Sequence, residues 1–112
     1  MTAQDTGIHE SESNIFAELG LPDADRHFLK AQLVAEIFRL TKAEGLTQAK
    51  AASRMGISQP EVSRLFRGHF REYSVERLLG FLTAFDRDVE IIARPTEKAG
   101  GQGSITFRHE TA

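Results

Sequence analysis

Residues 46–68, LTQAKAASRMGISQPEVSRLFRG, carry the signals for two short helices separated by a tight turn. Thr47 and Ser58 each stand where a helix begins, because a side-chain hydroxyl accepts a hydrogen bond from a first-turn amide that has no partner inside the helix. We therefore expect one helix at about 48–55 and another at about 59–67.

The segment around the turn restricts the fold further. Glu61, three residues after the second cap, completes a capping box, and Pro60 is tolerated because first-turn amides are unpaired. Gly56 stands where the backbone requires a positive φ angle, and Ala52 stands where crossing helices leave room only for a small side chain. The apolar residues spaced to face one core are Ile57, Val62 and Leu65. Together these features form the helix-turn-helix pattern.

Further helices are expected on both sides of this pair. A long helix should span about 23–44, and the apolar residues that recur in it at helical spacing are Leu29, Leu33, Val34, Ile37, Phe38 and Leu40. A short helical turn at about 14–19 should precede it. A last helix should begin after Ser74, whose hydroxyl can cap it.

Beyond residue 88 the apolar period changes from about 3.6 to about 2. The segments 89–94 and 104–108 are predicted to be β-strands, joined by a glycine-rich linker. Two short strands are marginal by themselves. They either form a hairpin packed on the helices or pair with a second chain, and we favour the second, a dimer. The predicted division is a flexible tail at 1–12, a DNA-binding domain at 13–88 and a β dimerisation element at 89–112.

Charge is distributed unevenly along the 112 residues. The net charge is −2, but residues 42–71 hold six basic and two acidic side chains, a sum of +4, which leaves −6 for the rest. A basic centre fits a nucleic-acid partner even though the whole chain is slightly acidic. Residues 1–25 contain six acidic residues and no Lys or Arg, so this segment suits either a basic protein partner or the role of a solvated leader that only aids solubility.

The stretch 46–68 resembles the helix-turn-helix of phage-repressor and Cro-like (XRE) DNA-binding domains. The span from NIFAELGLP (14–22) to DVEIIARP (88–95) resembles a subgroup that includes antitoxins of HigA type, small regulators encoded beside RelE-like toxins. The resemblance implies a mainly α, lambda-repressor-like bundle of four to five helices with a short C-terminal β-strand or hairpin. It also implies a dimeric repressor that binds a palindromic operator and controls its own operon.

In such a domain the start of the third helix points into the major groove, where the Gln59 amide matches the N6 donor and N7 acceptor of adenine. The resemblance implies that Gln48 contacts a phosphate and braces Gln59. Arg64 suits a guanine or a phosphate, and Pro60 suits a thymine methyl. The full set of predicted DNA-contact residues is Gln48, Lys50, Arg54, Gln59, Pro60, Ser63, Arg64 and Arg67. Lys50, Arg54 and Arg67 are assigned to phosphates, and such contacts supply binding affinity and fix the register of the protein on the DNA.

Other functional classes are disfavoured. The four histidines are scattered, no pair has the i, i+4 spacing of a helical metal site, and cysteine is absent, so we expect no metal, no cofactor and no enzyme activity. No apolar run is long enough to span a bilayer, and a cytoplasmic location is expected. Two alternatives to the antitoxin reading stay open: a protein-interaction module without DNA affinity, and a phage-type repressor without a toxin partner.

Overall fold

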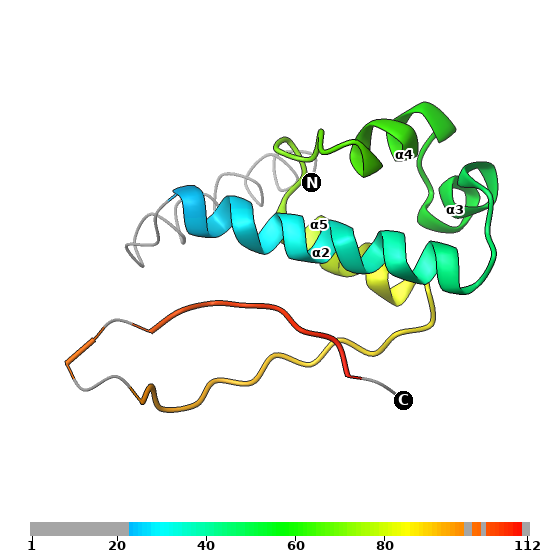
Figure 1. Ribbon diagram of the computed structural model, residues 1–112. Helices are drawn as coiled ribbons and strands as arrows, with labels where there is room; N and C mark the ends of the chain where they lie inside the picture. Colours follow the sequence, from blue (N-terminus) through cyan, green and yellow to red (C-terminus); the bar gives the residue numbers. More distant parts are fainter. Residues whose placement is uncertain (1–22, 98–99, 102, 111–112) are drawn as a thin grey trace, which may run out of the picture.

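The computed structural model describes residues 23–97, 100–101 and 103–110 (Figure 1). Within this part of the chain the helices are α2 (Asp23–Ala43), α3 (Gln48–Met55), α4 (Gln59–Phe66) and α5 (Val75–Thr83). The predictions for these elements are confirmed to within a residue or two. The helical turn expected at about 14–19 lies outside the described residues.

The core lies where α2, α4 and α5 meet. Leu33, Ile37 and Leu40 of α2 are completely buried. The other helices contribute Ala51, Ala52, Met55, Val62, Leu65, Leu78, Phe81 and Leu82. Phe38 departs from the prediction, because 41% of its side chain is exposed and its ring lies edge-on to Phe66 at 5.1 Å. The buried apolar stripe of α2 is therefore narrower than the sequence predicts.

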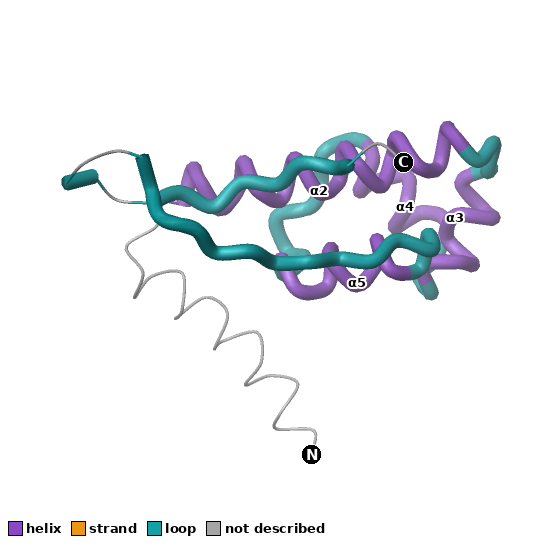
Figure 2. The backbone as a smooth tube through the Cα atoms, turned by 90° about the horizontal axis from the view of Figure 1, so that it is seen from below, coloured by secondary structure: helices purple, strands orange, loops and turns teal. Residues whose placement is uncertain are grey.

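The prediction of C-terminal β-strands is wrong for the described residues. Segments 89–97 and 103–110 form two long arms without strand structure. Figure 2 shows that the first arm follows α5 and the second follows α2. Alternating apolar residues indicated extended backbone correctly, but they could not indicate its partner.

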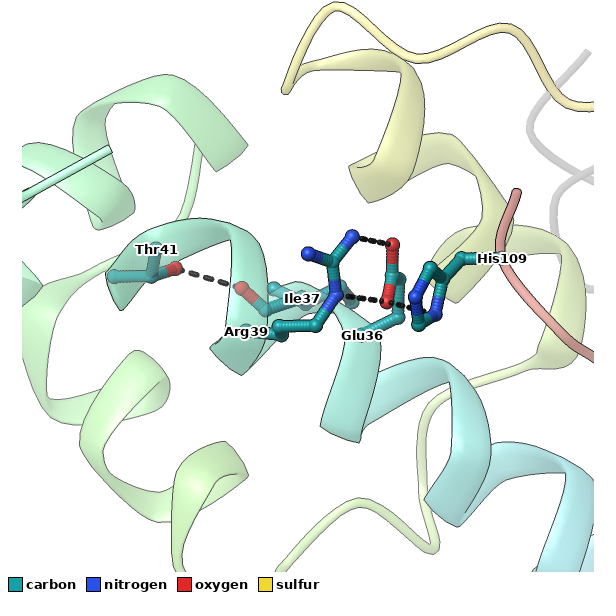
Figure 3. A network of polar contacts seen from close by, with 5 residues as sticks. All are labelled: Glu36, Ile37, Arg39, Thr41 and His109. Atoms are coloured by element: carbon teal, nitrogen blue, oxygen red, sulfur yellow. Dashed lines mark hydrogen bonds and ion pairs between the residues drawn. The ribbon is translucent and has the colours of Figure 1, made fainter. Parts of the chain in front are cut away.

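The second arm is attached to α2 by side chains in place of a neighbouring strand. The Gln32 amide donates from Nε2 to the Phe107 carbonyl oxygen at 3.1 Å, and its Oε1 accepts from the Phe107 amide at 3.2 Å. One turn along α2, Glu36 meets His109, with 3.2 Å between Oε1 and Nδ1 (Figure 3). A side-chain amide presents the same donor and acceptor as a backbone residue, so Gln32 takes the place of a pairing strand.

Glu36 is the buried charge on which this attachment depends. Its side chain is only 6% exposed, and Arg39 binds both carboxylate oxygens, at 2.8 and 2.7 Å (Figure 3). The hydrogen bonds from Arg39 are the main cause that lowers the pKa of Glu36, against the opposing effect of burial. The carboxylate is therefore charged near neutral pH and available to the arm.

Candidate nucleic-acid interface

The first of the two short helices, α3, is closed at its start by the predicted cap. The Thr47 hydroxyl accepts a hydrogen bond from the Lys50 amide at 3.1 Å, and the Thr47 backbone is extended, with φ −73° and ψ 163°. Gln48 is the first residue of the helix and its side chain is exposed. The cap thus brings Gln48 to the surface at the positive end of a helix dipole, where a phosphate is favoured.

The turn between α3 and α4 has the predicted left-handed conformation. Gly56 has φ 74° and ψ 27°, and its amide donates to the Ala52 carbonyl at 2.8 Å. The Ile57 amide donates to the same carbonyl at 3.1 Å. Ala52 is 4% exposed, as expected for a residue at a close helix crossing. The turn therefore fixes how α4 leaves α3.

The start of α4 is held by the predicted capping box. The Ser58 hydroxyl accepts from the Glu61 amide at 3.3 Å, while Glu61 Oε1 accepts from the Ser58 amide at 3.0 Å. These contacts with Ser58 are the main cause that lowers the pKa of Glu61. Gln59 and Pro60 lie inside this closed turn with exposed side chains. Gln59 is therefore presented to solvent by a turn whose backbone is fixed.

The two faces of α4 have different roles. Val62 and Leu65 are completely buried in the core. The exposed side carries Gln59, Pro60 and Arg64, with Arg67 exposed at the C-cap and Ser63 half-buried. With Gln48 and Lys50 exposed at the start of α3, the structure brings most of the predicted contact residues onto two adjacent helices. Figure 1 shows these helices on the opposite side of α2 and α5 from the arms.

Arg54 has a structural environment that the sequence did not reveal. Its Nη1 lies 2.5 Å from Oε1 of Glu44, and its guanidinium lies 5.5 Å from the centre of the Phe85 ring. The side chain thereby connects α3 to the end of α2 and to the core. Among the predicted phosphate contacts, Arg54 is the one already engaged within the chain, unlike Lys50 and Arg67, for which the structure gives no such pairing in the described residues.

Sequence reasoning missed Tyr73. Its hydroxyl donates to Oε2 of Glu61 at 3.3 Å, so it reaches the capping box of α4 from the connection that leads into α5. The available signal was its position directly before Ser74, the cap of α5, because residues just outside a helix often pack against neighbouring structure.

Comparisons with known proteins agree with this geometry. A family model described as a helix-turn-helix domain matches residues 15–94. The chain belongs to this helix-turn-helix family. A solved structure described as an XRE family transcriptional regulator is 36% identical, covers 80% of this chain and 100% of its own, and superposes with a TM-score of 0.74. No curated protein matches the chain's sequence significantly.

In a helix-turn-helix protein, α3 and α4 are the two helices expected to contact DNA. The predicted resemblance to XRE-like helix-turn-helix domains is confirmed. The solved structure is described as a transcriptional regulator. None of the described helices is both long enough and apolar enough to cross a bilayer. The described residues also contain no group of three or more His, Asp or Glu side chains arranged to hold a metal ion.

Proposed function

We propose that this protein is a sequence-specific transcriptional repressor that binds a palindromic operator as a homodimer. The observation that carries the proposal is the presentation of Gln48 and Gln59, each exposed in the first turn of a capped helix within a helix-turn-helix fold. The two helices pack against each other and are joined by the tight turn at Gly56. This arrangement suits entry of α4 into a major groove, with α3 lying across the DNA backbone.

Base reading is assigned to α4. The Gln59 amide pairs with N6 and N7 of an adenine, and Gln48 contacts a phosphate and braces it. Arg64 follows on the same exposed side and takes a guanine or a phosphate. Pro60 offers only apolar contact, such as a thymine methyl, and the half-buried Ser63 lies between these residues in the sequence. The specific contacts thus come from about one and a half turns of helix.

Backbone binding is assigned to the basic residues around this helix. Lys50 and Arg67 are exposed and suit phosphates, which position the protein without reading sequence. Arg54 contributes less in this proposal, because its ion pair with Glu44 would have to be broken or shared. The basic stretch 42–71 explains how a chain of net charge −2 binds a polyanion.

Dimerisation is assigned to the C-terminal arms. Ile91 and Ile92 are 83% and 73% exposed, and Ile105 is 42% exposed. Extended backbone with exposed apolar side chains favours association with another extended segment. In the proposed dimer the arms of one copy pair with those of the other, and each copy presents α4 to one half-site.

A pair of substitutions tests the DNA assignment. Gln59→Ala should cost about 1–3 kcal/mol of binding free energy at the operator and relax the base preference at one position per half-site. Arg67→Ala should weaken operator and random DNA together and reduce the salt dependence of binding. Equilibrium titration of both variants against both DNAs separates the two roles. Equal losses for Gln59→Ala on the two DNAs would contradict base reading.

We propose further that the protein neutralises a basic toxin of RelE-like type. The specific support is the acidic segment 1–25, with six carboxylates and no Lys or Arg. Such a segment attracts a basic partner by charge complementarity. Co-expression with the product of an adjacent gene tests this: co-purification and relief of growth arrest are expected. DNA binding without any such partner would favour a phage-type repressor, and partner binding without DNA affinity would favour an interaction module.

A further inference from the structure

Glu61 links two structural elements through its two carboxylate oxygens. Oε1 accepts from the Ser58 amide at 3.0 Å, which closes the start of α4. Oε2 accepts from the Tyr73 hydroxyl at 3.3 Å, and Tyr73 directly precedes the cap of α5. One carboxylate therefore ties the first turn of α4, which contains Gln59, to the connection between α4 and α5.

Tyr73 is itself held in place by α5. Its ring lies edge-on to Phe81 with 5.9 Å between ring centres, and Phe81 is 5% exposed in the core. The Arg77 guanidinium lies 5.0 Å from the centre of the Tyr73 ring. The Tyr73 amide also donates to the Phe70 carbonyl at 3.0 Å. The hydroxyl is thus a donor at the end of a ring fixed by the core.

The first turn of α4 has few other anchors. Gln59 and Pro60 are exposed, and the first fully buried side chain of α4 is Val62. Before that residue, the side-chain hydrogen bonds that hold the turn within the described residues are those of the capping box and the bond from Tyr73. A glutamine side chain recognises a base only when its amide is held at a fixed angle to the base edge, because bidentate hydrogen bonds are directional.

Protonation keeps this link intact near neutral pH. The pKa of Glu61 is lowered, chiefly by Ser58, so the carboxylate is charged. The pKa of Tyr73 is raised, first by burial and then by the charge of Glu61, so the hydroxyl keeps its proton. The donor and the acceptor are therefore both in the state that the bond requires.

We propose that Tyr73 is a positioning residue for sequence reading: through Glu61 it fixes the first turn of α4 and with it the direction of the Gln59 amide. The inference rests on the proposed function, because it concerns how Gln59 reads DNA. Tyr73 touches no base. Removing its hydroxyl leaves the Gln59 amide less firmly oriented but keeps the charges that bind phosphates. The preference for the operator therefore falls, while the affinity for random DNA stays the same.

The test compares the full-length protein with Tyr73→Phe, by titrating each against an operator duplex and a random duplex of equal length. The operator is the sequence that the wild-type protein protects upstream of its own gene. Tyr73→Phe should lose about two- to ten-fold in operator affinity and nothing on random DNA, as expected for one hydrogen bond. An unchanged ratio of the two affinities, or an equal loss on both, would overturn the proposal.

Two further variants isolate the hydroxyl. Thr83→Val removes the hydroxyl that bonds to the Gly80 carbonyl at 2.6 Å at the far end of α5, and both affinities should stay at the wild-type level. Glu61→Gln keeps one oxygen acceptor, for either Tyr73 or Ser58. It should therefore retain more of the preference for operator over random DNA than Glu61→Ala does. If Thr83→Val lowers the preference as much as Tyr73→Phe, the effect is general loosening of α5 and the proposal fails.

Hydrogen exchange in the free protein gives a second readout that does not depend on DNA. The Glu61 amide, which donates to the Ser58 hydroxyl, should exchange faster in Tyr73→Phe, while core amides of α2 keep their wild-type rates. Equal exchange at Glu61 in both proteins would overturn the proposal. If the wild-type protein prefers no DNA sequence, the proposed function itself is contradicted. If the wild-type protein prefers its operator and Tyr73→Phe keeps the same preference, only the role of Tyr73 is contradicted.

Discussion

The helical unit and the C-terminal arms use the same kinds of residue in opposite ways. Ile37 of α2 is completely buried, whereas Ile91 in the first arm is 83% exposed. The helices close a core within one chain. The second arm is joined to α2 through Gln32 and Glu36, and each arm packs one half-buried apolar side chain, Val89 or Phe107, against the core. The difference teaches that the apolar core of the described residues lies mainly in the helices, whereas the arms leave large apolar side chains at the surface.

The largest expected effect is on the helical side of this comparison. Leu33→Ala should lower the free energy of unfolding by about 2–5 kcal/mol, because it leaves a cavity beside completely buried neighbours. Urea denaturation measures this loss. Phe28→Ala on the same helix is the control, since Phe28 is 58% exposed and should cost about 1 kcal/mol or less. Equal losses would show that burial in α2 is not what stabilises the fold.

The next effect tests the turn on which the reading unit depends. Gly56→Val should cost about 1–3 kcal/mol, because a β-branched residue is strained at φ 74° even though no atom lies within 4 Å of the added Cβ. Thermal unfolding followed by circular dichroism measures it. Gly80→Ala is matched, since Gly80 lies in α5 with equally open surroundings and no positive φ, and should be neutral or stabilising. If Gly80→Ala lowered the unfolding temperature and Gly56→Val did not, the strain assigned to the positive φ of Gly56 would be contradicted.

A smaller effect is expected when the apolar surface of the arms is made charged. The double variant Ile91→Lys with Ile92→Lys should raise the dimer dissociation constant at least about ten-fold, because each side chain would otherwise be buried against the partner. Sedimentation over a range of concentrations measures this change. Glu90→Lys is the control, since the residue is an exposed neighbour that is already polar. A wild-type protein that stays monomeric at every concentration would remove the basis for the comparison.

The smallest effect concerns the attachment of the second arm. The pKa of Glu36 is lower in the folded protein than in the unfolded chain, chiefly because Arg39 donates to it. Its contribution is therefore complete above the unfolded value, about 4.3, and is lost as pH falls through the folded value. Glu36→Gln should cost about 1 kcal/mol at pH 7 and much less at pH 3. A difference from wild type that grows on acidification, in urea denaturation at both pH values, would contradict this assignment.

Sequence reasoning predicted the helical half well because its signals are local. Caps at Thr47 and Ser58, a left-handed glycine and helical apolar spacing each act within a few residues, and each is found as expected. These signals also predicted the helix starts at Gln48 and Gln59, whose side chains are exposed, while their contacts with DNA stay a prediction. The family match at 15–94 agrees with the span 14–95 on which the resemblance was based.

The misses depend on contacts between distant parts of the chain. Period-2 spacing indicated extended backbone at the C-terminus, but pairing needs a neighbour, and here the neighbour of Phe107 is Gln32, 75 residues away in the sequence. The ion pair between Arg54 and Glu44 joins residues ten positions apart, and no local signal indicated it; the assignment of Arg54 to a phosphate stays a prediction. Tyr73 was overlooked for the same reason. Periodicity and capping cannot reveal such long-range polar contacts.

The central claim is that the exposed turns of α3 and α4 read a specific operator as a pair of half-sites. The most direct test is a footprinting titration on the DNA upstream of the protein's own gene, at two salt concentrations and with random DNA as competitor. The account predicts two protected patches about one helical turn apart, roughly 34 Å, that persist in the presence of competitor and weaken as salt rises. No protection at low salt, or protection that random DNA abolishes, would contradict it.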